Sequence, residues 1–221
     1  LRRIGARLVH VNYVLPPLCP CRGVSTVHDL SYLVYPQDAP PRDLLVLGLL
    51  LRRSVQQARA IIAVSENTRR DIIRHLNVPA ERVMVIHEAA PPGLRRVADA
   101  GELARVHRVY GLSDPYILSV GNLQPRKNLP RLIDAFAAIR REGLASQLVI
   151  VGQDRWRTSD VFRSVRSAGL DDAVVFTGYV PDGDLSALYS GAAALAYASL
   201  YEGFGLPVLE AMMCGAPVVT S

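Results

Sequence analysis

The sequence predicts an α/β fold with parallel sheets, because short β-prone runs alternate with amphipathic helical runs along the chain. The connections between them are brief, as expected for parallel strands joined by crossover helices. Half of the 221 residues are hydrophobic and a fifth are charged, which is the composition of an ordinary globular protein. The longest apolar run, Leu44–Leu51, is shorter than the roughly 20 residues that cross a bilayer.

The first part of the chain, residues 1–95, contains four β-prone runs and two helical runs. The expected strands are Arg7–Val11, Val24–Val27, Ala60–Val64 and Arg82–Ile86, and the expected helices are Arg42–Gln57 and Glu66–Leu76. Ser65 has a side chain of the type that caps a helix N-terminus. We interpret residues 96–112 as a linker, whose short Arg-rich helical pattern could belong to either half.

The second part, residues 113–221, alternates more regularly. Its expected strands are Tyr116–Val120, Leu148–Val151, Val174–Thr177, Ala193–Ala198 and Val218–Thr220. Its expected helices are Asn128–Arg141, Asp160–Ala168, Asp184–Ser190 and Leu206–Cys214. This alternation predicts a doubly wound, Rossmann-like unit, whose ligands bind beyond the carboxyl ends of its strands.

The net charge of +5 suits an anionic ligand or an acidic membrane surface. The basic residues are scattered and not interleaved with aromatic ones, which argues against nucleic-acid binding. The only lysine, Lys127, follows Arg126 in the loop after the first strand of the second part. Two such cations can hold a diphosphate and offset the charge that develops when it leaves. Gly121 directly follows that strand and has no side chain, so another group can approach its backbone closely. A charged, solvated loop is the alternative.

Two glutamates eight positions apart, Glu202 and Glu210, flank the glycine-rich turn Gly203-Phe204-Gly205. Pro207 suits the first turn of a helix, and helix N-termini attract phosphate. Carboxylates accept hydrogen bonds from hydroxyls, so a sugar–diphosphate–nucleoside satisfies both chemistries. A glycosidase also uses two carboxylates, but a hydrolase needs no diphosphate clamp. The alternative is an exposed loop glutamate and a helix-surface glutamate.

Two further groups have competing interpretations. His28 follows the strand Val24–Val27, so it either faces the ligand or is a structural histidine tied to Asp29. Asp182-Gly183-Asp184 has the spacing of a D-x-D metal pair. We favour helix capping there, because the pair follows Pro181 and opens a predicted helix.

With these residues in place, the chain resembles the family 4 retaining glycosyltransferases of the GT-B type. The matching segments are Ser119–Asn128, Gly178–Asp184 and Glu202–Ser221 in the second part, and Val27–Pro36 and Ala63–His75 in the first. The segment from Glu202 carries the E-x7-E element of that family. The run His28–Pro36 resembles bacterial mannosyl- and rhamnosyltransferases, which favours GDP-mannose as the donor.

The resemblance implies a GT-B fold, in which two Rossmann-like parallel-sheet domains face each other across a cleft. Residues 1–95 would be the C-terminal part of the acceptor-side domain, and residues 113–221 the nucleotide-sugar-binding domain without its C-terminal end. Both domains would be incomplete, because the chain looks truncated at both ends.

The resemblance also implies roles for individual residues. The catalytic residues would be Glu202, His28, Arg126 and Lys127. The donor-binding residues would be Gly121, Arg126, Lys127, Gly203, Phe204, Gly205, Leu206 and Glu210. In this assignment the two cations grip the donor diphosphate, Glu202 and His28 meet the donor sugar, and Glu210 binds the ribose. The donor would be a GDP- or UDP-sugar, and no metal or other cofactor is expected.

The implied function is retaining transfer of a hexose, with mannose favoured, to a glycan or lipid-linked acceptor in polysaccharide biosynthesis. The alternatives are a GT-B sugar-nucleotide epimerase and a non-catalytic nucleotide-binding fragment. We expect a cytoplasmic location and no nucleic-acid partner. Peripheral contact with the inner face of the cell membrane could use the apolar run Leu44–Arg53, although we favour a buried helix as the explanation of that run.

Overall fold

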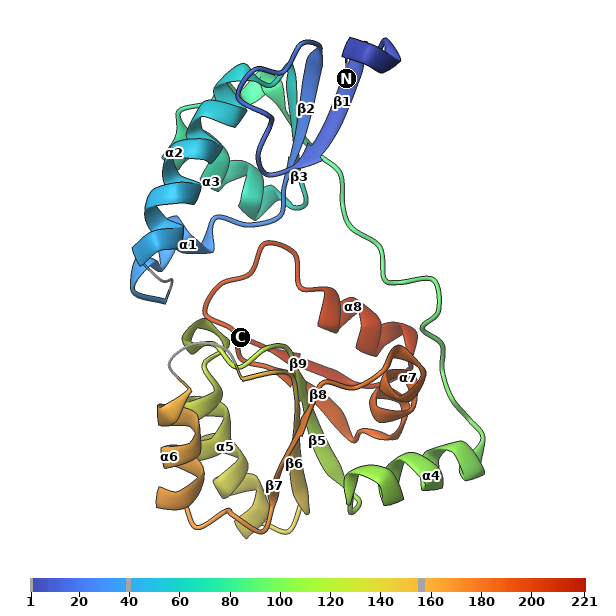
Figure 1. Cartoon of the computed structure of the whole chain (residues 1–221). Coiled ribbons are helices and arrows are strands. Elements are labelled where there is room, and N and C mark those ends of the chain that lie inside the picture. Colours follow the sequence, from blue (N-terminus) through green and yellow to red (C-terminus); the bar gives the residue numbers. More distant parts are fainter. Residues whose placement is uncertain (1, 39–40, 155–157) are drawn as a thin grey trace. The chain divides into compact units, whose positions relative to one another are not determined.

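The computed structural model describes residues 2–38, 41–154 and 158–221. The chain divides into two compact units, each built on its own parallel sheet (Figure 1). The first unit is Leu1–Glu88 together with Glu202–Phe204, and the second is Ala89–Tyr201 together with Gly205–Ser221. None of the described helices combines the length and the apolar character that a membrane crossing requires.

The sheet of the first unit has four parallel strands in the order β1-β2-β3-β4. The strands are β1 (Leu8–Asn12), β2 (Arg22–Val27), β3 (Ala60–Ala63) and β4 (Val83–Val85). The helices are α1 (Ser31–Val34), α2 (Pro41–Gln57) and α3 (Glu66–Leu76), with 3-10 turns at Arg2–Ile4, Pro36–Asp38 and Ala80–Arg82. The predicted cap of α3 is confirmed, since the Ser65 hydroxyl accepts a 3.0 Å hydrogen bond from the Thr68 N–H.

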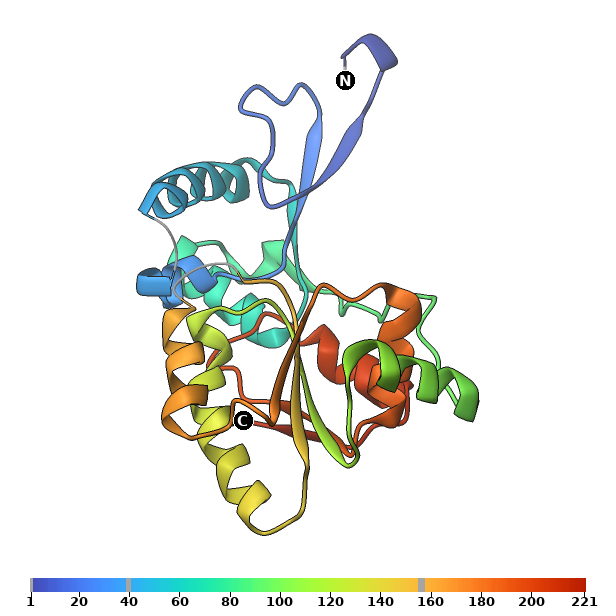
Figure 2. The same ribbon diagram turned by 60° about the horizontal axis from the view of Figure 1, so that its bottom comes forward.

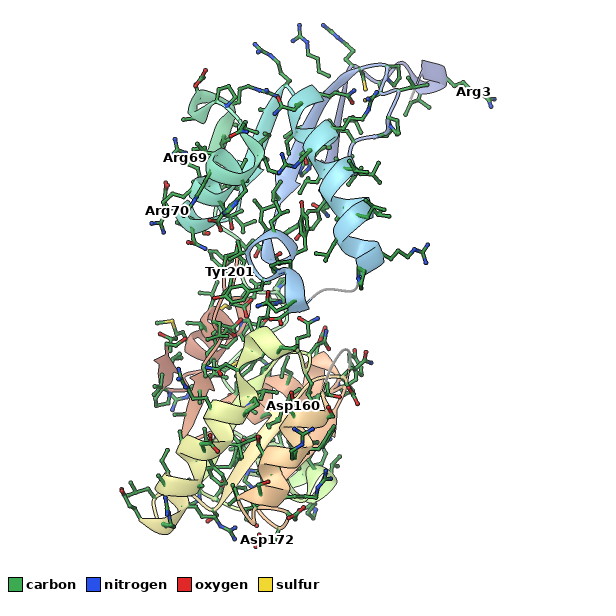
Figure 3. All side chains as sticks on the ribbon, turned by 90° about the vertical axis from the view of Figure 1, so that its left-hand side faces the viewer. Arg3, Arg69, Arg70, Asp160, Asp172 and Tyr201 are labelled. Carbon is green, nitrogen blue, oxygen red and sulfur yellow. The ribbon has the colours of Figure 1, made fainter. Side chains whose placement is uncertain are left out.

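Helix α2 is apolar on two sides. Leu51 and Val55 are fully buried in the core of the first unit. Four other apolar side chains form what we call the exposed face of α2: Leu45, Val46, Leu49 and Leu50. In Figure 3 the side chains on one side of α2 extend away from the rest of the unit. The expectation that burial explains this run is therefore wrong for half of it, because a helix of leucines can turn only one side to a core.

The second unit has five parallel strands in the order β7-β6-β5-β8-β9. The strands are β5 (Tyr116–Val120), β6 (Gln147–Val151), β7 (Val174–Gly178), β8 (Ala194–Tyr197) and β9 (Val218–Thr220). The helices are α4 (Ala100–Tyr110), α5 (Leu129–Arg141), α6 (Ser159–Ser167), α7 (Asp182–Gly191) and α8 (Leu206–Met213), and η4 (Pro125–Lys127) is a 3-10 turn. This is the strand order of a Rossmann-like sheet, as the sequence predicts.

Helices cover both faces of this second sheet. Figures 1 and 2 show α5 and α6 on one face, with α4, α7 and α8 on the other. Two apolar cores result. The core under α5 and α6 includes Phe136 and Ile150, and the core under α7 and α8 includes Leu118 and Leu195. Helix α4, within the stretch interpreted as a linker, packs on α7 of the second unit.

The capping interpretation of Asp182 and Asp184 is wrong. Helix α7 begins at Asp182 with Pro181 as its N-cap, and no side chain caps it. Asp184 instead forms an ion pair with Arg105 and accepts a 2.9 Å hydrogen bond from the Tyr110 hydroxyl. The guanidinium of Arg105 holds the pKa of the Asp184 carboxyl below its usual range. The Asp184 carboxylate therefore links α7 to α4 through Arg105 and Tyr110.

Candidate functional site

The strand order of the second unit defines where a ligand binds. The chain runs from β5 outward to β6 and β7 on one side, and β8 and β9 lie on the other. The order reverses between β5 and β8, and in open parallel sheets the crevice for the ligand lies beyond the carboxyl ends at such a reversal. The loop with Arg126 and Lys127 follows β5, and the glycine-rich turn follows β8. The two motifs thus leave neighbouring strands.

Lys127 contacts the last residue of β8, and Arg126 contacts the loop that follows β8. The Lys127 ammonium donates to the Tyr197 hydroxyl at 3.1 Å and lies 4.8 Å from the centre of that ring. Arg126 Nη1 donates to the Tyr201 carbonyl at 3.1 Å, and its own carbonyl accepts from the Leu200 N–H at 2.8 Å. Tyr197 is the last residue of β8. These bonds hold the two loops together at the reversal point.

Two glycines make the loop after β5 possible. Gly121 has a φ of +140°, and a side chain there would lie 3.0 Å from Lys127 Cε. Gly152, which follows β6, has a φ of +151°, and a Cβ atom there would collide with the Gly121 carbonyl. The groups that approach Gly121 closely in this structure are the Lys127 side chain and the backbone of Gly152.

Helix α8 begins at the same end of the sheet. Its N-cap, Gly205, has a φ of +100°, and Leu206 and Pro207 open the first turn, as predicted for the proline. A Cβ atom on Gly205 would lie 3.8 Å from the ring of Tyr197, so Tyr197 neighbours both Lys127 and the start of α8.

Glu210 is buried in α8 rather than lying on the helix surface. Its Oε2 accepts a 2.7 Å hydrogen bond from the Tyr189 hydroxyl of α7. Burial and the nearby Glu210 charge raise the pKa of Tyr189, so this hydroxyl keeps its proton and donates. Within the described residues Glu210 Oε1 has no hydrogen-bond partner, which leaves that oxygen able to accept from a ligand hydroxyl.

In the first unit, side chains at the carboxyl ends of the strands surround His28. His28 Nδ1 lies 2.6 Å from Glu88 Oε1, and Nε2 lies 3.3 Å from Asn12 Oδ1. The ring of Tyr13 packs 5.5 Å from the imidazole. The alternative that Asp29 holds His28 is wrong, because Asp29 Oδ1 accepts from the N–H and hydroxyl of Ser31 at the start of α1.

The segment Glu202–Phe204 belongs to the first unit. The Gly203 carbonyl accepts hydrogen bonds from the Ser65 hydroxyl at 2.5 Å and the Thr68 hydroxyl at 3.2 Å. A Cβ atom on Gly203 would collide with the backbone carbonyl of His28, so only glycine fits. The ring of Phe204 lies 5.9 Å from that of His87.

Tyr197, Tyr189 and Glu88 are among the residues of these sites that were not predicted. Tyr197 ends β8 and Glu88 follows β4, so their places at the ends of strands could have identified both. Tyr189 gave none, since a tyrosine inside a helix is more often a core residue. Within the described ranges, no group of three or more His, Cys, Asp or Glu side chains could hold a metal ion.

Comparisons with known proteins point to one family. The model of "Glycosyl transferases group 1" matches residues 105–221, and that of "Glycosyltransferase Family 4" matches residues 1–93. The chain is 35% identical over 212 residues to O-antigen chain mannosyltransferase B of Escherichia coli, covering 95% of this chain and 55% of that protein. The chain thus spans about half the length of this relative.

Solved structures agree on the fold. Sucrose-phosphate synthase from Thermosynechococcus elongatus matches 99% of this chain and 57% of its own, with a TM-score of 0.76 and 25% identity. HepE of Anabaena, in complex with UDP-glucose, matches 90% of this chain and 53% of its own, with a TM-score of 0.72 and 24% identity. The latter likeness concerns the fold alone.

Proposed function

The chain belongs to the group 1 glycosyl transferases, and on this premise we propose that it moves a hexose from a nucleotide-diphosphate sugar to an acceptor hydroxyl. The observation that carries the proposal is the meeting of Lys127 and the start of α8 around Tyr197, at the reversal point of the second sheet. Cations and a helix N-terminus are the groups that hold phosphates. The likeness to an O-antigen mannosyltransferase favours mannose as the sugar and a glycan or lipid-linked acceptor.

The proposed roles follow the chemistry of each group. Arg126 and Lys127 hold the diphosphate and stabilise it as the leaving group, so that no metal is needed. Glu210 accepts from the ribose, and Glu202 and His28 contact the sugar. The backbones of Gly121, Gly203 and Phe204 and the opening residues Gly205 and Leu206 of α8 complete the donor contacts.

A thermal-shift titration tests the donor site. GDP-mannose at about a hundred times its dissociation constant should stabilise the chain by roughly 2.7 kcal/mol, with EDTA present as well as without it. Glu210→Gln should abolish most of this shift, because the amide no longer offers a charged acceptor to the ribose. UDP-glucose and the bare nucleotides GDP and UDP identify the base that is recognised. A folded wild-type chain that responds to none of the four ligands contradicts the proposal.

We further propose that the transfer retains the configuration at the anomeric carbon, as the family resemblance implies. Transfer from GDP-α-mannose should therefore give an α-linked product. Proton NMR of the purified product distinguishes the two anomers by the coupling between H1 and C1. A β-linked product would contradict retention but not glycosyl transfer.

We propose in addition that the exposed face of α2 contacts an anionic lipid surface, at the inner face of the cell membrane. Arg42, Val46, Leu49 and Arg53 follow one another at spacings of three or four, so they lie in one line along the helix. All four side chains are exposed, and arginine at both ends of an apolar stripe suits an interfacial helix.

The chain should sediment with vesicles that contain anionic phosphatidylglycerol and much less with neutral phosphatidylcholine. The double variant Leu45→Ser and Leu49→Ser should weaken binding by more than about tenfold, since each leucine contributes roughly 1.5–3 kcal/mol when buried. Leu144→Ser, an equally exposed leucine of the second unit, is the control. Equal sedimentation of both variants would contradict the assignment.

A further inference from the structure

We propose that Glu88 is a positioning residue that fixes the proton of His28 on Nδ1 and leaves Nε2 as the nitrogen that meets a sugar hydroxyl. The assignment of the proton stands on the geometry of the first unit alone. The role of Nε2 rests on the function proposed above.

The contact between Glu88 and His28 is short and directional. Glu88 Oε1 lies 2.6 Å from Nδ1. An ionised carboxylate offers only acceptors, so Nδ1 must be the donor in both the neutral and the charged imidazole. In a neutral histidine only one ring nitrogen carries the proton, and the hydrogen bonds of the ring decide which one it is. In the neutral imidazole Nε2 is therefore the nitrogen without a proton.

The setting of Nε2 suits an exchangeable partner. Asn12 lies 3.3 Å away, a longer contact than that of Glu88, in an exposed environment. Its amide can offer either its oxygen or its N–H, so it accompanies both protonation states of Nε2. The His28 side chain is 36% exposed, whereas a histidine with only a structural role in a core is expected to be buried. A hydroxyl can thus replace the amide at Nε2.

The other neighbours of the imidazole hold its plane without competing for Nδ1. The Tyr13 ring packs against it with an interplanar angle of 48°, and the Tyr13 hydroxyl accepts from the Asp29 N–H. Asp29 is committed to Ser31. Glu88 is thus the carboxylate that acts on this ring in the described part of the first unit.

Nitrogen-15 NMR of the histidine rings tests the tautomer without any substrate. The His28 signals, assigned by their loss in His28→Gln, should show a protonated Nδ1 in the wild type and in Glu88→Gln, whose amide oxygen still accepts. In Glu88→Ala the proton should move to Nε2. Glu81→Gln, an exposed glutamate of the same unit, should change nothing. A wild-type His28 protonated on Nε2 alone overturns the inference.

Kinetics test the role of Nε2, in the natural protein that carries this sequence, with GDP-mannose as the donor. Glu88→Ala should lower kcat/KM by about tenfold to a hundredfold, the range known for residues that orient a metal-bound imidazole, with Glu88→Gln recovering most of it. Unchanged kinetics despite a changed tautomer would overturn the role of Nε2. A wild type that neither binds nor uses a nucleotide sugar would refute the proposed function, while the NMR result would still decide the tautomer.

Discussion

Replacing Lys127 by Met should weaken the binding of GDP by about thirtyfold. The methionine keeps the unbranched stem that packs on Gly121 and beside Tyr197, but it removes the charge. A hydrogen bond to a charged group contributes roughly 1.5–3 kcal/mol, which corresponds to about this loss of affinity. During transfer the same charge would face the departing diphosphate, so kcat should fall by about 10²–10³. Isothermal titration calorimetry and initial rates measure the two effects.

Two controls show whether the loss concerns phosphate. Arg131→Ala removes an exposed cation on α5 and should leave GDP binding unchanged. Guanosine, which lacks phosphates, should bind the Lys127→Met variant as it binds the wild type. If guanosine binding falls in parallel with GDP binding, Lys127 supports the loop and does not hold the diphosphate.

The second large effect is expected at Gly152. An alanine there should destabilise the second unit by about 3 kcal/mol or more, because two costs add. The φ of +151° is unfavourable for a side chain, at about 1–3 kcal/mol. The new Cβ would also collide with the backbone carbonyl of Gly121, so the loop after β5 must move, at about 1–3 kcal/mol more. Chemical denaturation measures the loss.

Gly143→Ala separates these two costs. Gly143 also has a positive φ, of +72°, but a Cβ atom there has open space around it. It should therefore lose only about 1–2 kcal/mol. Equal losses at both glycines would show that the contact between the loops after β5 and β6 is not tight.

The positions of the strands along the chain could be predicted well from the sequence, because each core strand is a short apolar run between polar connections. Tyr116–Val120 and Val218–Thr220 are observed with the predicted bounds, and Glu66–Leu76 likewise among the helices. The four-residue helix α1 (Ser31–Val34) was not predicted. Its start depends on the Asp29 side chain, a local bond that apolar periodicity does not reveal.

Partners of polar side chains were harder to predict than elements. Asp184 has the residue type and position of a cap, yet it pairs with Arg105, which lies 79 positions away in sequence. Glu88 reaches His28 from 60 positions away. Periodicity and capping rules describe neighbours along the chain, so they identify which residues are polar and near a strand end, but not which of them meet.

The strand order of the second unit also bears on how the protein is made. Ribosomes release the chain from its N-terminal end, and β5 at the centre of the sheet emerges before either flank. The core beneath α5 and α6 draws its buried residues from positions 123–174, so it can form while β8 is still unsynthesised. The loop with Arg126 and Lys127 would then be held by its own βαβ scaffold, and β8 with the glycine-rich turn after it would add later to an existing sheet edge.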